Sequence, residues 1–321
     1  MGLQAPAKPR IPPSLHSIGC LNTPDVLILG GGGILGEAWL SSVLAGLGEA
    51  DSFDARDCKA CIGTSAGSIV AAMLCAGVDP RSGLGKLPEQ PAVPAADGYV
   101  GSSPGAQVLQ TSASLAAAAT GPLASILLRS TAPGGRLLRR AALSRVRRGQ
   151  RSLADLGRAI DESEARWDGR LQISAVEMES GRRVIFDGSG NPEVTVAEAV
   201  QASCAIPGVF RPLVVDGHSY VDGGVWSPTN MDCAEVGRGS RVLCLNPTGS
   251  LRPRRATPIG ALVAFSRSAA AIEAAALRQR GAEVRVIAPD DTSVAAIGPN
   301  LMDPALRADV VAAGLAQGRR L

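Results

Sequence analysis

The chain has 321 residues, of which 45% are hydrophobic and 19% charged, so its composition is that of a globular protein rather than a disordered one. A net charge of +3 with only 3% aromatic residues argues against a nucleic-acid partner, which would require a concentrated basic face and aromatic platforms. The seven cysteines are an odd number and the N-terminus has no apolar signal core. We therefore expect a cytoplasmic protein without a disulfide framework.

The first part of the chain predicts a strand, a glycine turn and a helix. Residues 1–24 are rich in proline and predict a flexible N-terminal segment, followed by a single domain over residues 25–321. The apolar run from Val26 to Leu29 ends in four consecutive glycines, which is typical of a buried parallel strand feeding a tight turn. Apolar residues at helical spacing follow over residues 37–49.

A second unit repeats this order. Residues 60–63 predict a strand, the glycines around Ser65 a turn, and residues 68–76 a helix. Two successive strand–turn–helix units indicate an α/β fold with a mainly parallel sheet covered by helices. Cys58 and Cys61 form a C-x-x-C pair, which we interpret as two small buried thiols. A redox site needs its first cysteine near the start of a helix, and a zinc site needs a second pair of cysteines at matching spacing.

The pattern then dissolves over residues 81–151, which we interpret as an insertion or lid. Its second half, residues 129–151, carries eight arginines and no acidic residue. One hypothesis is a peripheral contact with anionic lipid headgroups at a membrane surface. A solvated helix face explains the arginines equally well.

Regular structure is predicted again beyond this region. Asp216-Gly217 is a hairpin turn signal between two short apolar runs. The predicted elements are helices over 152–165, 196–203 and 303–317, and strands over 171–178, 183–186, 213–215, 219–221, 241–245 and 283–288.

Ser65 is the candidate nucleophile. It lies between Gly63 and Gly67 on the predicted strand-to-helix turn, the context in which G-x-S-x-G exposes a serine hydroxyl. The N-terminus of the following helix would favour negative charge that develops there. The alternative is a structural serine that caps this helix.

A nucleophilic serine needs a base, and the two histidines are poor candidates. His16 lies in the flexible N-terminal segment, and His218 lies at the tip of the predicted hairpin. Asp222 is the better candidate, because it ends a predicted strand and Gly223-Gly224 lets another backbone segment approach it. An ordinary turn aspartate is the alternative interpretation.

The first glycine turn allows two interpretations. Gly31, Gly33 and Gly36 fit the dinucleotide-binding pattern G-x-G-x-x-G. A dinucleotide site also requires an acidic residue at the end of the next strand, where this chain has the serine turn. The other interpretation is an oxyanion hole built from backbone amides, in which one donor can contribute ~3 to 4 kcal/mol.

Four blocks together resemble the patatin-like phospholipase family: LGGGGILG, GTSAGSIVAAMLCAG, AVQASCAIPGVFRPL and YVDGGVWSP, spread over residues 29–228. The resemblance implies a three-layer α/β/α sandwich and a Ser-Asp dyad without histidine. By position it implies Ser65 as nucleophile, Asp222 as base, and Gly31, Gly32 and Gly33 as the oxyanion loop, with supporting glycines at positions 36, 63, 67, 223 and 224. Leu35 stands where the family usually has arginine.

The resemblance further implies that the substrate is a fatty-acyl ester of a lipid and that no metal cofactor takes part. An acyltransferase that uses the same acyl-enzyme is an alternative. A non-catalytic nucleotide- or lipid-binding module is a third interpretation.

Overall fold

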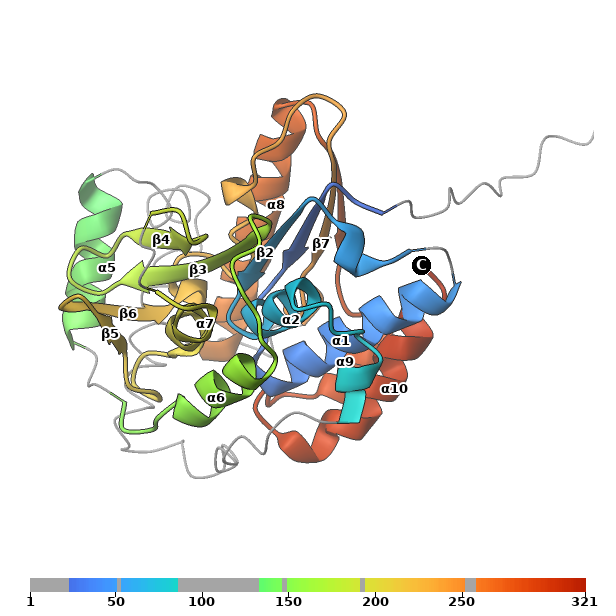
Figure 1. The fold of residues 1–321 in the computed structure, drawn as a ribbon, viewed down its shortest axis with the longest axis horizontal. Helices are drawn as coiled ribbons and strands as arrows, with labels where there is room; N and C mark the ends of the chain where they lie inside the picture. The colour runs from blue at the N-terminus through green and yellow to red at the C-terminus, as the bar shows by residue number, and fades with distance from the viewer. Residues whose placement is uncertain (1–22, 51–52, 86–132, 146–148, 191–193, 252–257) are drawn as a thin grey trace, which may run out of the picture.

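A computed structural model describes residues 23–50, 53–85, 133–145, 149–190, 194–251 and 258–321 (Figure 1). Its centre is an eight-stranded sheet with the order β5-β6-β3-β2-β1-β7-β8, in which β4 also pairs with β3. The parallel strands are β1 (Val26–Leu29), β2 (Ala60–Thr64), β3 (Leu171–Glu177), β7 (Arg241–Leu245) and β8 (Glu283–Ile287). The antiparallel strands are β4 (Arg183–Phe186), β5 (Leu213–Val215) and β6 (His218–Asp222).

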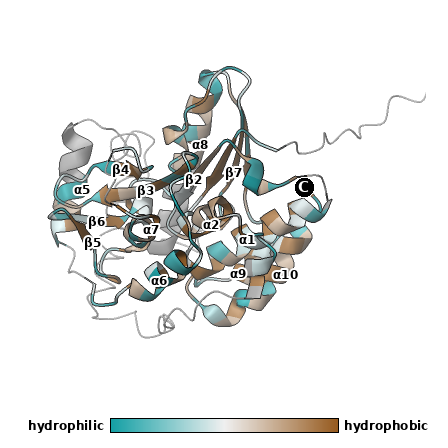
Figure 2. Cartoon of the chain, in the orientation of Figure 1, coloured by the Kyte–Doolittle hydropathy of each residue, from teal (hydrophilic) through white to brown (hydrophobic). Residues whose placement is uncertain are grey.

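Helices cover both faces of the sheet because its central strands are apolar on both faces (Figure 2). In β1, Leu27 and Leu29 face one hydrophobic cluster, whereas Val26 and Ile28 face another. The first cluster packs against α1 (Gly33–Ala50), α2 (Ala66–Cys75), α6 (Ala154–Glu162), α7 (Val196–Cys204), α9 (Asp291–Ile297) and α10 (Arg307–Gly318). The second packs against α8 (Pro258–Gln279).

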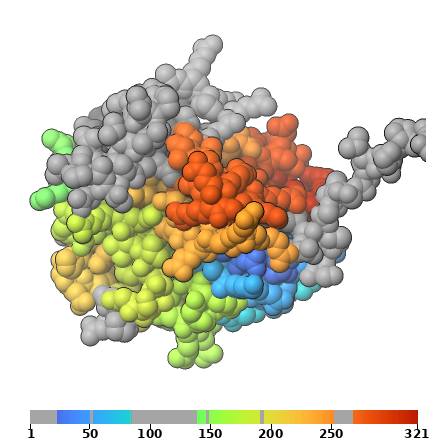
Figure 3. Space-filling view, turned by 90° about the horizontal axis from the view of Figure 1, so that it is seen from above, coloured from blue at the N-terminus to red at the C-terminus, as the bar shows by residue number. Residues whose placement is uncertain are grey.

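This arrangement confirms the predicted three-layer α/β/α sandwich with a mainly parallel sheet. Among the described residues seen from above, the middle and C-terminal parts of the chain form most of the surface, with a smaller area from the N-terminal third (Figure 3). That distribution fits β1 and β2 lying at the centre of the sheet. None of the described helices is long and apolar enough to cross a lipid bilayer.

Several element bounds differ from the sequence-based expectation. The first helix begins at Gly33, directly in the glycine turn, and the closing helix begins at Arg307 after a short 3-10 turn. Helices α8 and α9 were not predicted. For α8, Ala270, Ala274 and Leu277 give an i, i+4, i+7 apolar stripe that could have predicted the helix.

Most of the predicted insertion over residues 81–151 lies outside the described residues, as does the N-terminal segment up to residue 22. The described parts of the insertion include a 3-10 turn over Ser82–Gly85 and helix α5 (Pro133–Arg145). Leu143 of α5 packs with Val176, Val221 and Trp226 in a third, smaller hydrophobic cluster beside β3 and β6.

Candidate active site

Two strand ends meet at the candidate site. β3 pairs with β2 over residues 171–174 and with β6 over residues 175–177, while β4 occupies the other edge of β3 over residues 173–176. β2 and β6 therefore lie end to end along one edge of β3. The Thr64–Ser174 pair is followed directly by the Asp222–Ala175 pair. This register brings Ser65, the residue after Thr64, next to Asp222.

Ser65 occupies a strained turn and does not cap its helix. Its backbone has φ 50° and ψ −122°, a conformation that non-glycine residues rarely adopt. It stands at the N-cap position of α2, yet its side chain makes no capping hydrogen bond. Its backbone N–H donates to Ser203 Oγ at 2.8 Å, which ties the turn to α7. The hydroxyl is thus left available for another partner.

The Asp222 carboxyl group lies close enough to this hydroxyl for the Ser65 side chain to lower its pKa. Asp222 is 6% exposed and accepts a hydrogen bond from the Gly224 N–H at 2.7 Å. Burial raises the pKa of Asp222 to about 6, although the Ser65 side chain and the Gly224 N–H lower it. The carboxylate is therefore ionised at neutral pH yet basic enough to accept a proton.

Two of the three backbone amides predicted for the oxyanion hole have no backbone acceptor in the described chain. The Gly31 N–H donates to the Pro228 carbonyl at 2.8 Å, so this amide already has a partner. Within the described chain, the N–H groups of Gly32 and Gly33 donate to no backbone carbonyl. Gly33 has φ 63° and begins α1, where the first N–H groups have no intrahelical acceptor.

The glycines of the motifs allow close approaches of backbone. A Cβ at Gly67 would lie 2.0 Å from the Leu29 carbonyl oxygen, and one at Gly63 would lie 2.5 Å from Ser68 Cα. A Cβ at Gly223 would lie 2.5 Å from the Ser174 carbonyl oxygen, so the backbone of β3 approaches closely beside Asp222. Gly36 is less constrained, with Pro247 Cβ at 3.3 Å.

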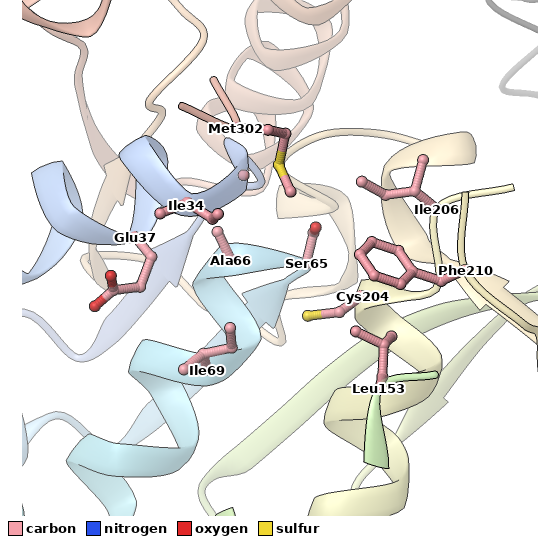
Figure 4. Close-up of a pocket in the computed structure, with 11 residues that line it drawn as sticks. Ile34, Glu37, Ser65, Ala66, Ile69, Leu153, Cys204, Ile206, Phe210 and Met302 are labelled. Carbon is pink, nitrogen blue, oxygen red and sulfur yellow. The ribbon is translucent and has the colours of Figure 1, made fainter. Parts of the chain in front are cut away.

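A small, mostly apolar pocket that is partly open to solvent lies over the turn. The Ser65 hydroxyl points into it, between Met302 on one side and Ile206 and Phe210 on the other (Figure 4). Glu37 also lines the pocket, but its carboxylate points away from Ser65 and forms an ion pair with Arg307 at 2.5 Å. The remaining lining residues include Ile34, Ala66, Ile69, Leu153 and Cys204. Such a lining suits an acyl chain.

Two residues near Ser65 were not singled out from the sequence. Ser203 Oγ accepts a hydrogen bond from the Ser65 N–H, and Cys204 lines the pocket with Ser65 while its thiol lies 3.8 Å from Ser68 Oγ. Burial raises the pKa of Cys204, and the charge of Asp222 raises it further, so the thiol stays protonated. Both residues lie in the AVQASCAIPG block, but a block resemblance does not predict which side chains face the turn.

Leu35, at the position where arginine is usual, is buried in the hydrophobic core. Its N–H donates to the Leu301 carbonyl, so this stretch of α1 is covered by the segment before α10. The dinucleotide interpretation of the turn finds no support, because β2 ends at Thr64 and is followed by Ser65 rather than by an acidic residue.

His218 lies at the far end of β6 from Asp222, about 13 Å along the strand. Its side chain is 54% exposed, and Nδ1 lies 2.8 Å from Glu177 Oε1. Together with Glu179 these two residues form a group whose potential metal-ligand atoms lie within 4.8 Å of one another. This group is remote from Ser65. The Cys58 and Cys61 thiols are free and buried, in line with the interpretation from sequence.

The arginine-rich segment is only partly described. Arg140 and Arg145 are exposed, but Arg139 is buried with its guanidinium 3.8 Å from the centre of the Trp226 ring. Burial and the charge of Arg183 lower the pKa of Arg139 to about 10. Arg139 thus packs inside the protein, which corrects the expectation that this residue faces solvent or lipid.

Comparison with solved structures gives distant similarities. VipD from Legionella pneumophila is 16% identical with a TM-score of 0.42, over 93% of this chain and 66% of that one. The type III effector ExoU is 16% identical with a TM-score of 0.35, over 92% of this chain and 52% of that one. A chain of the ExoU–SpcU complex from Pseudomonas aeruginosa is 20% identical with a TM-score of 0.32, over 93% of this chain and 53% of that one.

This chain spans about half to two thirds of the length of those chains. No curated protein matches it. The model of the family described as patatin-like phospholipase matches residues 27–234, more than half of the chain and all four sequence blocks. The chain therefore belongs to the patatin-like phospholipase family.

Proposed function

We propose that the protein is a serine acyl hydrolase that cleaves fatty-acyl esters of lipids, with Ser65 as nucleophile and Asp222 as base. The observation that carries the proposal is the placement of the Ser65 side chain. It stands on a strained turn, leaves its helix uncapped, and lies beside the buried Asp222 carboxyl group, whose pKa is raised to about 6. The family membership and the apolar pocket support a lipid substrate.

The reaction is an acyl transfer in two steps. Asp222 accepts the Ser65 proton while Oγ attacks the ester carbonyl, and the amides of Gly32 and Gly33 donate to the oxyanion. Asp222 then returns the proton to the leaving alcohol, which leaves an acyl group on Oγ. In the second step Asp222 takes a proton from water while the water oxygen attacks the acyl carbonyl. The acyl–Oγ bond then breaks, Asp222 returns the proton to Ser65 Oγ, and the fatty acid is released.

Labelling with a fluorophosphonate tests the nucleophile. The probe should label the wild-type protein on Ser65 and abolish its hydrolysis of acyl esters, because Oγ displaces fluoride and forms a stable phosphonate ester. Ser65→Ala should be neither labelled nor active, and Asp222→Asn should react at least a hundredfold more slowly. Ser42→Ala is the matched control, since Ser42 is a fully buried serine of α1 whose hydroxyl, in the described part of the chain, donates to the Trp39 carbonyl.

Ester hydrolysis that persists in Ser65→Ala would contradict the scheme. Product analysis by mass spectrometry with an added alcohol separates hydrolysis from acyl transfer, because a transferase would yield the ester of that alcohol in place of the free acid.

A peripheral contact with anionic lipid remains part of the proposal, through exposed arginines such as Arg140 and Arg145. Binding to vesicles should increase with their phosphatidylglycerol content, fall with salt, and weaken in an Arg140→Glu/Arg145→Glu variant. Arg166→Glu, an exposed arginine outside this segment, should bind like the wild type. Co-sedimentation that is insensitive to anionic lipid would favour a merely solvated helix face.

A further inference from the structure

One buried side-chain amide lies where the ends of β2 and β6 meet. Asn230 is fully buried and has φ 47° and ψ 30°. Its Nδ2 lies 3.1 Å from Thr64 Oγ1, 3.1 Å from Ser174 Oγ, 3.3 Å from the Gly223 carbonyl oxygen and 2.5 Å from the Ser227 carbonyl oxygen. Thr64 immediately precedes Ser65, and Gly223 immediately follows Asp222.

The chemistry of these partners fixes the orientation of the amide. The two carbonyl oxygens can only accept, so the NH₂ group must face them, and the guanidinium of Arg183, which can only donate, lies 3.3 Å from Oδ1. The hydroxyls continue the chain of hydrogen bonds. Thr64 Oγ1 lies 2.8 Å from Ser174 Oγ, which donates to the Gly63 carbonyl at 3.4 Å.

The amide spans a junction that strand pairing leaves open. In the described chain β2 and β6 each pair with β3, but no ladder joins them to each other. The separation between Ser65 and Asp222 therefore depends on contacts across the two strand ends. The loop that carries Asn230 also accepts the Gly31 N–H through the Pro228 carbonyl, so it contacts the glycine turn as well.

We propose that Asn230 is a positioning residue, whose side-chain amide holds the end of β2 against the end of β6 and so sets the distance between Ser65 Oγ and the Asp222 carboxylate. Asn230 touches neither the nucleophile nor the base, and it acts through Thr64 and Gly223. The inference rests on the proposed function, since it concerns the geometry of that catalytic pair. A displacement of about 1 Å at such a pair can cost a hundredfold in rate.

The test compares Asn230→Gly with a neighbour in the same loop. Glycine tolerates the left-handed backbone of position 230, so this variant removes the amide with the least strain. Thr229→Val is the matched control, because Thr229 is equally buried in the same loop but donates to Glu273 of α8 instead of to the junction. Measurements are kcat and KM for a soluble acyl ester, the rate of fluorophosphonate labelling, and thermal unfolding.

Asn230→Gly should lower kcat and the labelling rate at least tenfold while KM stays within about twofold. Thr229→Val should lower the unfolding temperature but keep the wild-type kcat. Thr64→Val removes the hydroxyl that accepts a hydrogen bond from the Asn230 amide, and it should also lower kcat. The double variant Thr64→Val/Asn230→Gly should be no slower than Asn230→Gly alone. If Asn230→Gly does not fold, Thr64→Val and the isosteric Asn230→Asp, whose ionised carboxylate cannot donate, are measured in its place.

A folded Asn230→Gly with wild-type kcat would overturn the positioning role, as would equal losses of kcat in Asn230→Gly and Thr229→Val. Both results differ from failure of the proposed function. In that case the wild-type protein itself would lack esterase activity, or would retain it after Ser65→Ala.

Discussion

At the scale of single residues, the pKa of Asp222 links stability to the proposed chemistry. Its folded-state pKa of about 6 lies above the ordinary value of 3.8, so the native carboxyl holds its proton more tightly than the unfolded chain does. Rising pH between about 4 and 6 therefore removes roughly 3 kcal/mol of stability, a loss that is complete above that window. A buried charge that destabilises the fold in this way is typical of a functional site.

The same carboxylate predicts the pH dependence of the reaction. Because only ionised Asp222 can accept the Ser65 proton, kcat/KM for a soluble ester should rise about tenfold per pH unit below pH 6 and level off above it. Stopped assays from pH 4.5 to 8.5 would measure the profile. A rate that is flat across this range, with the protein folded throughout, would exclude Asp222 as the base.

At the scale of secondary-structure elements, the sequence predicted the two strand–turn–helix units and the hairpin because each depends on local signals. Each of these signals acts within a few residues. They are the apolar run before the first glycine turn, the glycines at positions 63 and 67 around Ser65, and Asp216-Gly217 between two short strands. Asp216 and Gly217 both adopt positive φ, as a tight hairpin turn requires. Local chemistry therefore identified the turn that carries Ser65 and the hairpin whose second strand ends at Asp222.

The proximity of Ser65 to Asp222 could not be predicted from such local signals. It depends on the register of β3 with β2 and with β6, and these strands come from distant parts of the chain. Nothing in the sequence of β3 indicates that Ser174 pairs with Thr64 and the next residue with Asp222. The role of Asn230 was missed for the same reason, since an asparagine in a loop acquires its partners only from the tertiary structure. The local residues made Asp222 a candidate base with an ordinary turn aspartate as the alternative, and the family resemblance implied its pairing with Ser65.

At the scale of the whole molecule, the chain beyond the family match completes the fold. Residues 235–321 include β7, which pairs with β1 at the centre of the sheet, and α10, which packs closely against α1. The close packing depends on glycine, because a Cβ at Gly46 would lie 2.5 Å from the Leu315 carbonyl oxygen. The segment before α10 places Met302 beside Gly33, so the C-terminal part of the chain also lines the pocket.

Gln317 of α10 joins three elements through one buried side chain, and its loss should destabilise the whole domain. Its amide oxygen accepts from Trp39 Nε1 at 3.0 Å and from Ser293 Oγ at 2.9 Å, and its Nε2 donates to the Ala288 carbonyl at 2.8 Å. Gln317→Ala leaves these buried groups unpaired and opens a cavity, which should lower the free energy of unfolding by about 3 kcal/mol.

Urea denaturation measures this loss, and Gln150→Ala serves as its control, since Gln150 is exposed and the change should stay within about 0.5 kcal/mol. The kcat of the folded Gln317→Ala protein should equal that of the wild type, because Gln317 lies on α10 and outside the pocket lining. Unchanged unfolding would mean that α10 contributes little to the cohesion of the domain, contrary to its buried contacts. A lower kcat in the folded protein would instead indicate that α10 and the segment before it control the shape of the pocket.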